Sequence, residues 1–429
     1  MIVFWFRRDL RMHDNAGLAA ALASGQPVLP LFVYDTDILD QLPKDDHRLA
    51  FIHQLLERIQ SQLQKHGKAL ATFHGKPIDV FKKLRETHGI TAIYTNRDYE
   101  PAARERDKAI YEWACAEKIE YKSFKDQVIF ERSEIVKDDG SPYVVYTPYS
   151  KRWLSVFENK TLETYQSDHT FEPYVAHSFP FLGLADIGFT EPTIKIEEPN
   201  TAASLIDAYG EQRNFPAVKA TSKLSPHLRF GSVSIRELVQ KANKSADKTF
   251  LKELIWREFF MMILYHYPHT VTKSFKPAYD RIEWRNNEEE FKSWCEGKTG
   301  FPMVDAGMRE LNRTGWMHNR VRLVVASFLC KHLLIDWRWG EAYFALKLSD
   351  YEQSSNVGNW QWAAGSGVDA APYFRIFNPA EQIKKFDPKL VYCKRNIPEL
   401  ETTYYPSPIV DHKTARDRCL QVYKAGLES

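Results

Sequence analysis

The chain has 429 residues, a net charge of +2, 44% hydrophobic and 27% charged residues. This composition is typical of a globular protein, and the length is sufficient for two or three domains. No run of eighteen apolar residues occurs, so a membrane-spanning helix is excluded. The opening MIVFWFRRDL has no small-residue cleavage site, which predicts a buried strand and not a signal peptide.

The five cysteines are odd in number and lie far apart, without a CxxC pair. This pattern argues against a disulfide framework and against a zinc ribbon, and no metal site is predicted. We expect a reducing, cytoplasmic location.

Charge and tryptophan are both unevenly distributed. Residues 1–200 carry 25 basic and 30 acidic side chains, a net charge of −5, which leaves +7 for the remainder. Eight of the 11 tryptophans lie between residues 256 and 362. A basic, aromatic-rich half suits a polyanion partner, although ordinary scatter of charge between domains explains the numbers equally well.

The first 130 residues alternate short apolar runs with amphipathic stretches. Nearly all-apolar strands separated by helices indicate a parallel sheet covered on both faces. We predict a doubly wound α/β domain over residues 1–130. The predicted strands are 2–6, 28–34, 69–75 and 91–96, and the predicted helices are 48–65, 78–87 and 101–117.

Two further regions follow. Residues 131–200 are weakly periodic and rich in proline, which predicts a connector with little regular structure. Residues 201–429 have almost no strand signal and predict an all-α domain. The strongest apolar helical patterns there are 250–266 and 320–337.

Two short motifs concern phosphate binding. Thr221-Ser-Lys-Leu-Ser-Pro226 is typical of a helix N-terminus, whose free N–H groups can bind phosphate, although a plain helix cap is the commoner explanation. Residues 365–370 match a GxGxxA dinucleotide fingerprint. No apolar strand precedes them and Pro372 follows, so we interpret the match as chance.

Two polar blocks interrupt the helical region. Arg320 and Arg322 enter an apolar helix on different faces and need partners, for which Asp350 and Glu352 are available. The block 350–362 combines carboxylates, amides and paired tryptophans. It could line a site for a flat heteroaromatic molecule or pack as an ordinary loop on the core.

Motifs along the whole length resemble the photolyase/cryptochrome family, and within it the class I cyclobutane pyrimidine dimer photolyases. The resemblance rests on Phe4-Trp-Phe-Arg-Arg-Asp-Leu-Arg11, Arg213-Asn-Phe-Pro216, Thr221–Pro226, Glu253-Leu-Ile-Trp-Arg-Glu258, Gly315-Trp-Met-His-Asn-Arg320, Asp336-Trp-Arg338, Asn359-Trp-Gln-Trp-Ala-Ala364 and Asp369–Pro379. It implies an enzyme, a deoxyribodipyrimidine photo-lyase, that uses light to split pyrimidine dimers in DNA.

The resemblance implies a non-covalent FAD, active as FADH−, in the helical domain. Asn356 would face flavin N5, where an amide can bond without delivering a proton. Asp350 and Glu352 would lie beside the isoalloxazine and ribityl groups, with Arg322 paired to Asp350. The remaining implied FAD contacts are Tyr209 and the phosphate segment Thr221, Ser222, Lys223, Leu224 and Ser225.

A dimer must be flipped out of the duplex to reach a buried flavin. By resemblance, Trp256 and Trp362 would stack on the pyrimidines, while Glu253 and Asn319 would bond their polar edges. Glu253 would stabilise negative charge best if protonated. Leu323 stands where related repair enzymes often carry Met, and it keeps the site apolar. Implied contacts to the DNA backbone are Arg213, Arg320, Arg375 and Gln382.

The resemblance also implies routes for electrons and light energy. Trp360, Trp337 and Trp284 would form an electron-transfer chain, for which core packing is the alternative explanation. Glu100 resembles a contact to an antenna, which could be methenyltetrahydrofolate, a deazaflavin, another flavin or no molecule.

We therefore predict a repair enzyme that acts as a monomer on DNA containing cyclobutane pyrimidine dimers. We expect no membrane partner, and we expect association with the nucleoid through DNA if the protein is bacterial. One alternative is a cryptochrome-type photoreceptor. Such proteins often carry a C-terminal tail, and little sequence follows Tyr405–His412 here. A dark FAD oxidoreductase is the other alternative, and the lack of a credible nicotinamide fingerprint argues against it.

Overall fold

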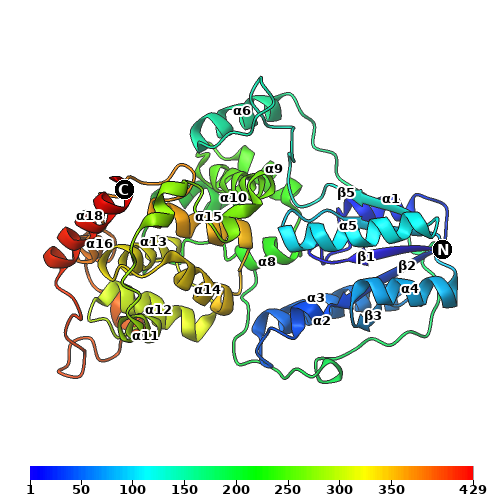
Figure 1. Ribbon diagram of the computed structural model, residues 1–429. Helices are drawn as coiled ribbons and strands as arrows, with labels where there is room; N and C mark the ends of the chain where they lie inside the picture. The colour runs from blue at the N-terminus through cyan, green and yellow to red at the C-terminus, as the bar shows by residue number, and fades with distance from the viewer. Residues whose placement is uncertain (429) are drawn as a thin grey trace. The chain divides into compact units, whose positions relative to one another are not determined.

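The computed structural model describes residues 1–428 and divides into two compact units (Figure 1). The first unit comprises residues 1–134, 154–199 and 223–244, and the second comprises, of the described residues, 135–153, 200–222 and 245–428. Each unit is thus built from three separate chain segments. The predicted domain limits of 1–130, 131–200 and 201–429 stay a prediction. Among residues 1–428, no helix is both long and apolar enough to cross a membrane.

The first unit contains a parallel five-stranded sheet in the order β3-β2-β1-β4-β5, which confirms the predicted α/β class. All four predicted strands are present. The additional edge strand β5 was missed because EYKSF alternates polar residues and lacks an apolar run. The strands are β1 (Ile2–Phe6), β2 (Val28–Tyr34), β3 (Ala71–His74), β4 (Ala92–Asn96) and β5 (Glu120–Phe124).

Side chains of β1 alternate between two cores, as the two-residue period of a strand requires. Ile2, Phe4 and Phe6 pack with helices α1 and α3, whereas Val3 and Trp5 pack with α4 and α5. Helices therefore cover both faces of the sheet, which explains its continuous apolar strands. The helices of this unit are α1 (Ala16–Leu22), α2 (Thr36–Leu39), α3 (His47–Gln64), α4 (Pro77–His88), α5 (Pro101–Ala116), η1 (Ala185–Ile187), α8 (Ser225–Phe230) and α9 (Ile235–Lys244).

A buried network of charges joins α9 to the carboxyl edge of the sheet. Arg236 Nε donates to Asp14 Oδ2 at 2.9 Å, and its Nη2 donates to Asp126 Oδ1 at 2.8 Å. Arg11 Nη2 reaches the other oxygen of Asp126 at 2.8 Å. Burial alone would raise the pKa of Asp126, but the two guanidinium groups lower it below its ordinary value. Every carboxylate of this network therefore has a cation.

The second unit is helical, as predicted, with no β-strand between residues 135 and 428. Its core gathers buried tryptophans, including Trp294, Trp337 and Trp360. Its helices are α7 (Ala203–Gln212), α10 (Thr249–His266), η2 (Pro268–Val271), η3 (Pro277–Arg281), α11 (Glu288–Glu296), α12 (Pro302–Thr314), α13 (Asn319–Ser327), the π-turn η4 (Phe328–His332), α14 (Trp337–Lys347), α15 (Gln353–Ala364), α16 (Pro379–Phe386), α17 (Val391–Asn396) and α18 (His412–Glu428).

One helix prediction was wrong in detail, and one helix was missed. The pattern over 320–337 is not one helix, because Leu334 adopts a left-handed φ of 51° and Asp336 caps a new helix by accepting from Arg338 N. The predicted connector 131–200 contains helix α6 (Tyr146–Glu158), whose aromatic residues Tyr146, Tyr149 and Trp153 follow helical spacing. Its proline-rich neighbourhood obscured that pattern.

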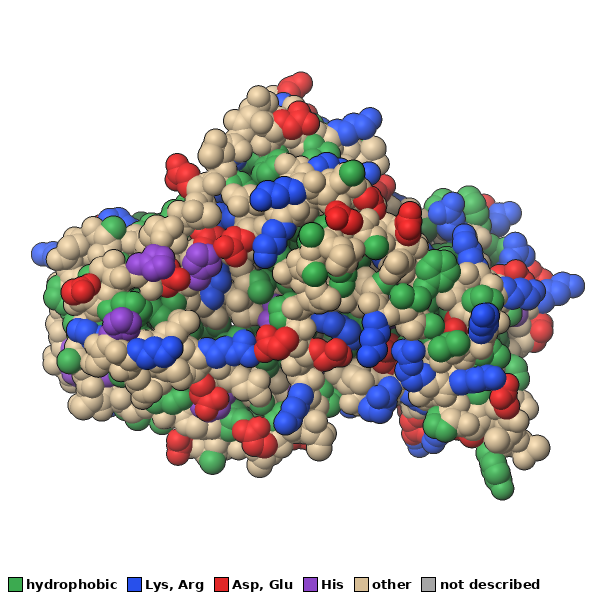
Figure 2. Space-filling view, turned by 180° about the vertical axis from the view of Figure 1, so that it is seen from behind, with side chains coloured by type: hydrophobic (Ala, Val, Ile, Leu, Met, Phe, Trp, Pro, Cys, Tyr) green, Lys and Arg blue, Asp and Glu red, His purple; other side chains and the backbone are tan. Residues whose placement is uncertain are grey.

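Charged side chains of both signs are interspersed over the face shown in Figure 2. The basic excess of residues 201–429 therefore does not form a single-sign field across that face.

Candidate functional site

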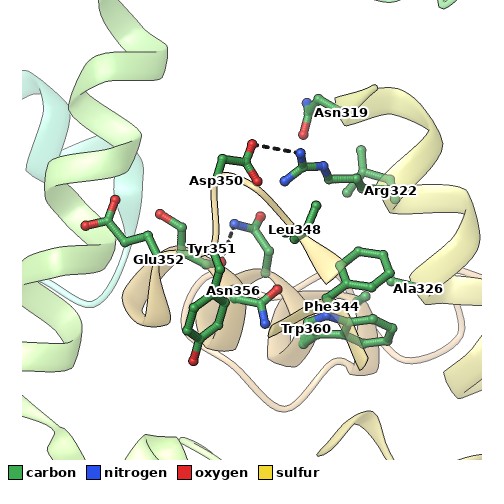
Figure 3. A pocket seen from close by; sticks show the side chains of 14 residues that line it. Asn319, Arg322, Ala326, Phe344, Leu348, Asp350, Tyr351, Glu352, Asn356 and Trp360 are labelled. Atoms are coloured by element: carbon green, nitrogen blue, oxygen red, sulfur yellow. Dashed lines mark hydrogen bonds and ion pairs between the residues drawn. The ribbon is translucent and has the colours of Figure 1, made fainter. Parts of the chain in front are cut away.

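A cavity opens in the helical unit between α13, α14, α15 and the loop before α15 (Figure 3). It contains about 590 Å³ of space between atoms, a volume that includes open solvent at its mouth. The structure brings seven predicted site residues to its wall: Asn319, Arg322, Leu323, Asp350, Glu352, Asn356 and Trp360.

The predicted ion pair of Arg322 and Asp350 forms at this wall. Arg322 Nη2 donates to Asp350 Oδ2 at 2.8 Å, while Arg322 Nε is held by the carbonyl of Met317, also at 2.8 Å (Figure 3). The other carboxylate oxygen, Asp350 Oδ1, is buried without a hydrogen-bond partner. A buried acceptor without a donor is costly, so this atom is suited to a donor group on a ligand.

Asn356 is oriented by a residue that the sequence analysis missed. Its Nδ2 donates to Glu341 Oε1 at 2.9 Å and to the Glu341 carbonyl at 3.0 Å. Burial raises the pKa of Glu341, and Tyr351 OH donates to the same carboxyl oxygen at 3.5 Å. Because Nδ2 is occupied, Oδ1 is the atom of the amide left to meet a ligand, and it is an acceptor. Glu341 carries no motif that would have revealed it, since its role depends on contact between α14 and α15.

Trp360 lines the cavity from α15 and is 2% exposed. A Cβ at Gly340 would lie 2.1 Å from the Trp360 ring, so glycine permits α14 and α15 to approach closely there. Trp294 meets Trp360 at a centroid distance of 6.1 Å. Trp337 is also buried, and its Nε1 has no hydrogen-bond partner. Trp284 lies half-buried against Tyr423, with centroids 5.9 Å apart.

A second group of predicted residues lies on α7 and α10, away from the cavity wall. Arg213 pairs with Glu253, and its guanidinium lies 5.3 Å from the ring centroid of Tyr209. The expected role of Glu253 at the dimer stays a prediction. Trp256 is half-buried on α10, as Trp362 is on α15.

Arg320 and Arg322 have different partners, as their two-residue spacing in a helix predicts. Arg320 leaves α13 on a different face from Arg322: its Nη2 donates to Asn214 Oδ1 at 2.6 Å and its guanidinium lies over the Phe386 ring. Arg375 is exposed, and Gln382 lies in α16 with its Oε1 buried and unpartnered.

The predicted phosphate segment crosses the limit between the two units, so each part is described by itself. Thr221 and Ser222 belong to the second unit, and Lys223, Leu224 and Ser225 to the first. Lys223 adopts a left-handed φ of 54°, and Leu224 occupies the N-cap of α8 without a side-chain hydrogen bond. The plain hydroxyl cap is therefore absent. In the first unit, Glu100 accepts from Arg229 Nη1 at 2.8 Å and pairs with Arg8 at 3.2 Å.

Comparison with known families agrees with this geometry. Residues 2–168 match the family described as DNA photolyase, and residues 250–404, which contain most of the cavity wall, match the FAD binding domain of DNA photolyase. The chain belongs to the DNA photolyase family and is an enzyme of that family with its FAD-binding domain.

Its curated relatives carry one particular name, deoxyribodipyrimidine photo-lyase. The protein from Vibrio cholerae is 35% identical, with 99% of each chain covered, and the one from Escherichia coli is 35% identical, with 98% of each covered. Among solved structures, a bacterial class III photolyase from Agrobacterium tumefaciens is similar with a TM-score of 0.89 at 34% identity, covering 100% of this chain and 98% of that one. A Synechocystis cryptochrome matches with a TM-score of 0.84 at 26% identity, covering 98% of this chain and 99% of that one.

Proposed function

We propose that this chain repairs cyclobutane pyrimidine dimers in DNA, driven by light absorbed by a bound FAD. One observation carries the proposal: Asp350, whose Oδ1 is an unpartnered buried acceptor, lines the same cavity as Asn356, whose amide oxygen is an acceptor, and the buried indole of Trp360. This set of groups fits a flat, hydrogen-bonding heterocycle, and it lies in the segment that matches an FAD-binding domain.

The bound reduced flavin would supply the photochemistry, by giving an electron to the dimer and receiving it back after the two linking bonds break. The protein would contribute binding and electrostatics. Asp350, fixed by Arg322, would accept an N–H donor of the ring, and Glu341 would hold Asn356 with its oxygen toward the ligand. An acceptor at Asn356 favours a ligand with an N–H group facing it, as reduced flavin has at N5.

The remaining FAD contacts would come from Glu352, Tyr209 and the segment 221–225. The left-handed backbone at Lys223 turns the chain into α8, whose first N–H groups receive no side-chain cap. The hydroxyls of Thr221 and Ser222 in the helical unit are suitable donors for phosphate oxygens, and Ser225 stays a predicted contact.

The damaged dinucleotide would be flipped toward Trp256 and Trp362, with Asn319 and Glu253 at its polar edges and Leu323 against its apolar surface. Asn319 and Leu323 line the cavity, which would bring the dimer near the flavin. Arg213, Arg320, Arg375 and Gln382 would contact the DNA backbone, which positions the strand without reading its sequence.

Electrons for reducing the flavin would travel through Trp284, Trp337 and Trp360. A second, light-harvesting chromophore is also proposed, since the similar photolyase from Sulfolobus tokodaii, with a TM-score of 0.87 at 34% identity and 99% coverage of both chains, contains two FAD molecules. A folate, a deazaflavin or a flavin could serve here, with Glu100 as a contact. We further propose a monomer that works in the cytoplasm on chromosomal DNA.

The direct test compares repair in light and darkness. Purified protein with reduced flavin should convert a dimer-containing oligonucleotide to normal pyrimidines under blue light and leave it unchanged in the dark. If illuminated protein bleaches and recovers its flavin while the dimers remain, repair is refuted and a photoreceptor is indicated.

The role of Glu253 is tested by Glu253→Ala, with the exposed Glu288→Ala as a matched control. Because the substitution frees Arg213 for the DNA backbone, repair yield should fall more than DNA affinity. Equal losses in both would contradict a role for Glu253 at the dimer itself. Glu288→Ala should change neither.

The tryptophan route is tested by Trp360→Phe, with Trp316→Phe as the control. The first substitution should block light-driven reduction of oxidised flavin and spare repair by chemically reduced enzyme. Loss of both activities would contradict the assignment.

A further inference from the structure

The start of α6 is fixed against α10 within the helical unit, although the two segments are about one hundred residues apart in sequence. Trp153 Nε1 donates to Glu258 Oε1 at 2.6 Å, and Tyr149 OH approaches the same oxygen at 3.4 Å. Glu258 is 3% exposed. Two donors on one buried carboxylate define how residues 146–153 lie along α10.

Tyr146, at the first position of α6, stacks on Trp256. The ring centroids are 3.6 Å apart and the planes differ by 6°. Tyr146 OH donates to the carbonyl of Lys252 at 2.8 Å, and the Tyr146 ring meets the edge of Phe259 at 5.9 Å. Burial raises the pKa of Tyr146, so the hydroxyl keeps its proton. The ring therefore cannot slide or turn without losing a hydrogen bond and a stacked contact.

The stack fixes Trp256 in turn. The indole contacts Phe260 at 5.4 Å and Phe259 at 5.6 Å on its own helix, yet part of it remains exposed. A partly exposed indole without a partner would sample several rotamers, and binding would have to select one of them. A ring already held in one orientation avoids that entropic cost.

We propose that Tyr146 is a positioning residue for the damaged dinucleotide, which holds the Trp256 indole as a preformed stacking platform. The inference rests on the proposed function, in which Trp256 stacks on the flipped pyrimidines. Tyr146 acts through Trp256 and not by touching the DNA. Its contribution should appear in dimer affinity, and not in flavin binding or in the yield once the dimer is bound.

The experiment uses Tyr146→Leu, which fills the volume without a flat ring, and Tyr146→Phe, which keeps the ring and loses the bond to Lys252. Tyr149→Phe is the matched control, because it keeps the ring that packs on Phe259 and leaves Trp153 bonded to Glu258. Dissociation constants in the dark are measured by fluorescence anisotropy for a dimer-containing oligonucleotide and for the same undamaged sequence. Repair yield is measured at saturating DNA, and flavin content reports folding.

Tyr146→Leu should weaken dimer binding at least about fivefold, the lower end of what loss of one base-stacking contact costs. Undamaged DNA should bind this variant as tightly as it binds the unmodified protein. The repair yield at saturating DNA should be unchanged. Tyr146→Phe should remain within about twofold of the unmodified protein, as expected when the stack persists. Adding Tyr146→Leu to Trp256→Ala should cause no further loss.

Unchanged dimer affinity in Tyr146→Leu, together with a loss in Trp256→Ala, would overturn this inference and leave the proposed function intact. An equal loss in Tyr149→Phe would overturn it too, because the loss would then not be specific to the ring that stacks on Trp256. If Trp256→Ala itself binds dimers normally, the proposed stacking role of Trp256 fails, and this inference fails with it.

Discussion

Two sets of buried carboxylates, one in each unit, differ in how completely they are paired with cations. In the α/β unit, Asp14 and Asp126 are almost fully buried, and each meets an arginine. In the helical unit, Asp350 has a cation on one oxygen only, and no ion pair to Glu341 is found in the described part of the chain. A buried carboxylate that has its cation in place is costly to disturb, because removing the cation leaves an uncompensated charge, whereas an unsatisfied acceptor in a cavity is an atom that a ligand can satisfy. The difference distinguishes a structural network from a binding site.

The largest expected effect comes from breaking the paired network. Arg236→Met leaves two buried carboxylates without a shared cation and should lower the free energy of unfolding by about 3–5 kcal/mol. Urea denaturation followed by circular dichroism measures the change. Arg58→Met, which removes an exposed pair with Glu198, is the control and should cost less than about 1 kcal/mol. Similar losses in both variants would show that the buried network has no special role.

Removing FAD tests whether the cavity with the unpartnered Asp350 oxygen depends on a ligand for its stability. With free FAD at one hundred times its dissociation constant, the holoprotein should be more stable than the apoprotein by about 2.7 kcal/mol. Urea midpoints at several FAD concentrations measure this difference. Urea midpoints that do not depend on the FAD concentration would mean that FAD does not stabilise the folded protein.

Buried histidine adds a pH dependence to the helical unit. Burial, with His412 and Arg418 nearby, lowers the pKa of His332 to about 3, and its Nε2 lies 2.8 Å from His412 Nδ1. The unfolded chain binds a proton here below about pH 6.5 and the folded chain does not, so stability falls as pH decreases from 6.5 toward 3. Between pH 6.5 and 5 the loss should be about 2 kcal/mol. His332→Gln should flatten the slope measured by urea titration, while the exposed His269→Gln should not.

The smallest effect is expected at Glu341. Burial raises the pKa of Glu341 in the folded chain, so this side chain ionises more easily in the unfolded chain. At a pH above the ordinary pKa of a glutamate, Glu341 therefore destabilises the fold. Glu341→Gln keeps an acceptor for Asn356 and should raise stability at pH 8 by less than about 1 kcal/mol. A large loss on substitution would instead indicate that the charge itself is needed.

Sequence reasoning succeeded where one local signal determines structure. The all-apolar β1 and β2 could be predicted because a strand buried on both faces has no polar positions. The cost of burying a lone charge predicted that Arg322 needs a partner, and the family resemblance implied that this partner is Asp350. Glu341 and Tyr146 could not be found this way. Each acquires its role from a residue on another helix, and only the folded chain brings them together.

The interleaving of the two units along the chain has a consequence for biosynthesis. Asp14 leaves the ribosome 222 residues before Arg236, the cation that neutralises it. At about 5–20 residues per second, translation takes roughly ten to forty seconds to supply that partner. Until Arg236 is synthesised, the carboxylates of the nascent sheet must stay hydrated. A ribosome stalled before α9 would therefore carry an incompletely folded, protease-sensitive chain.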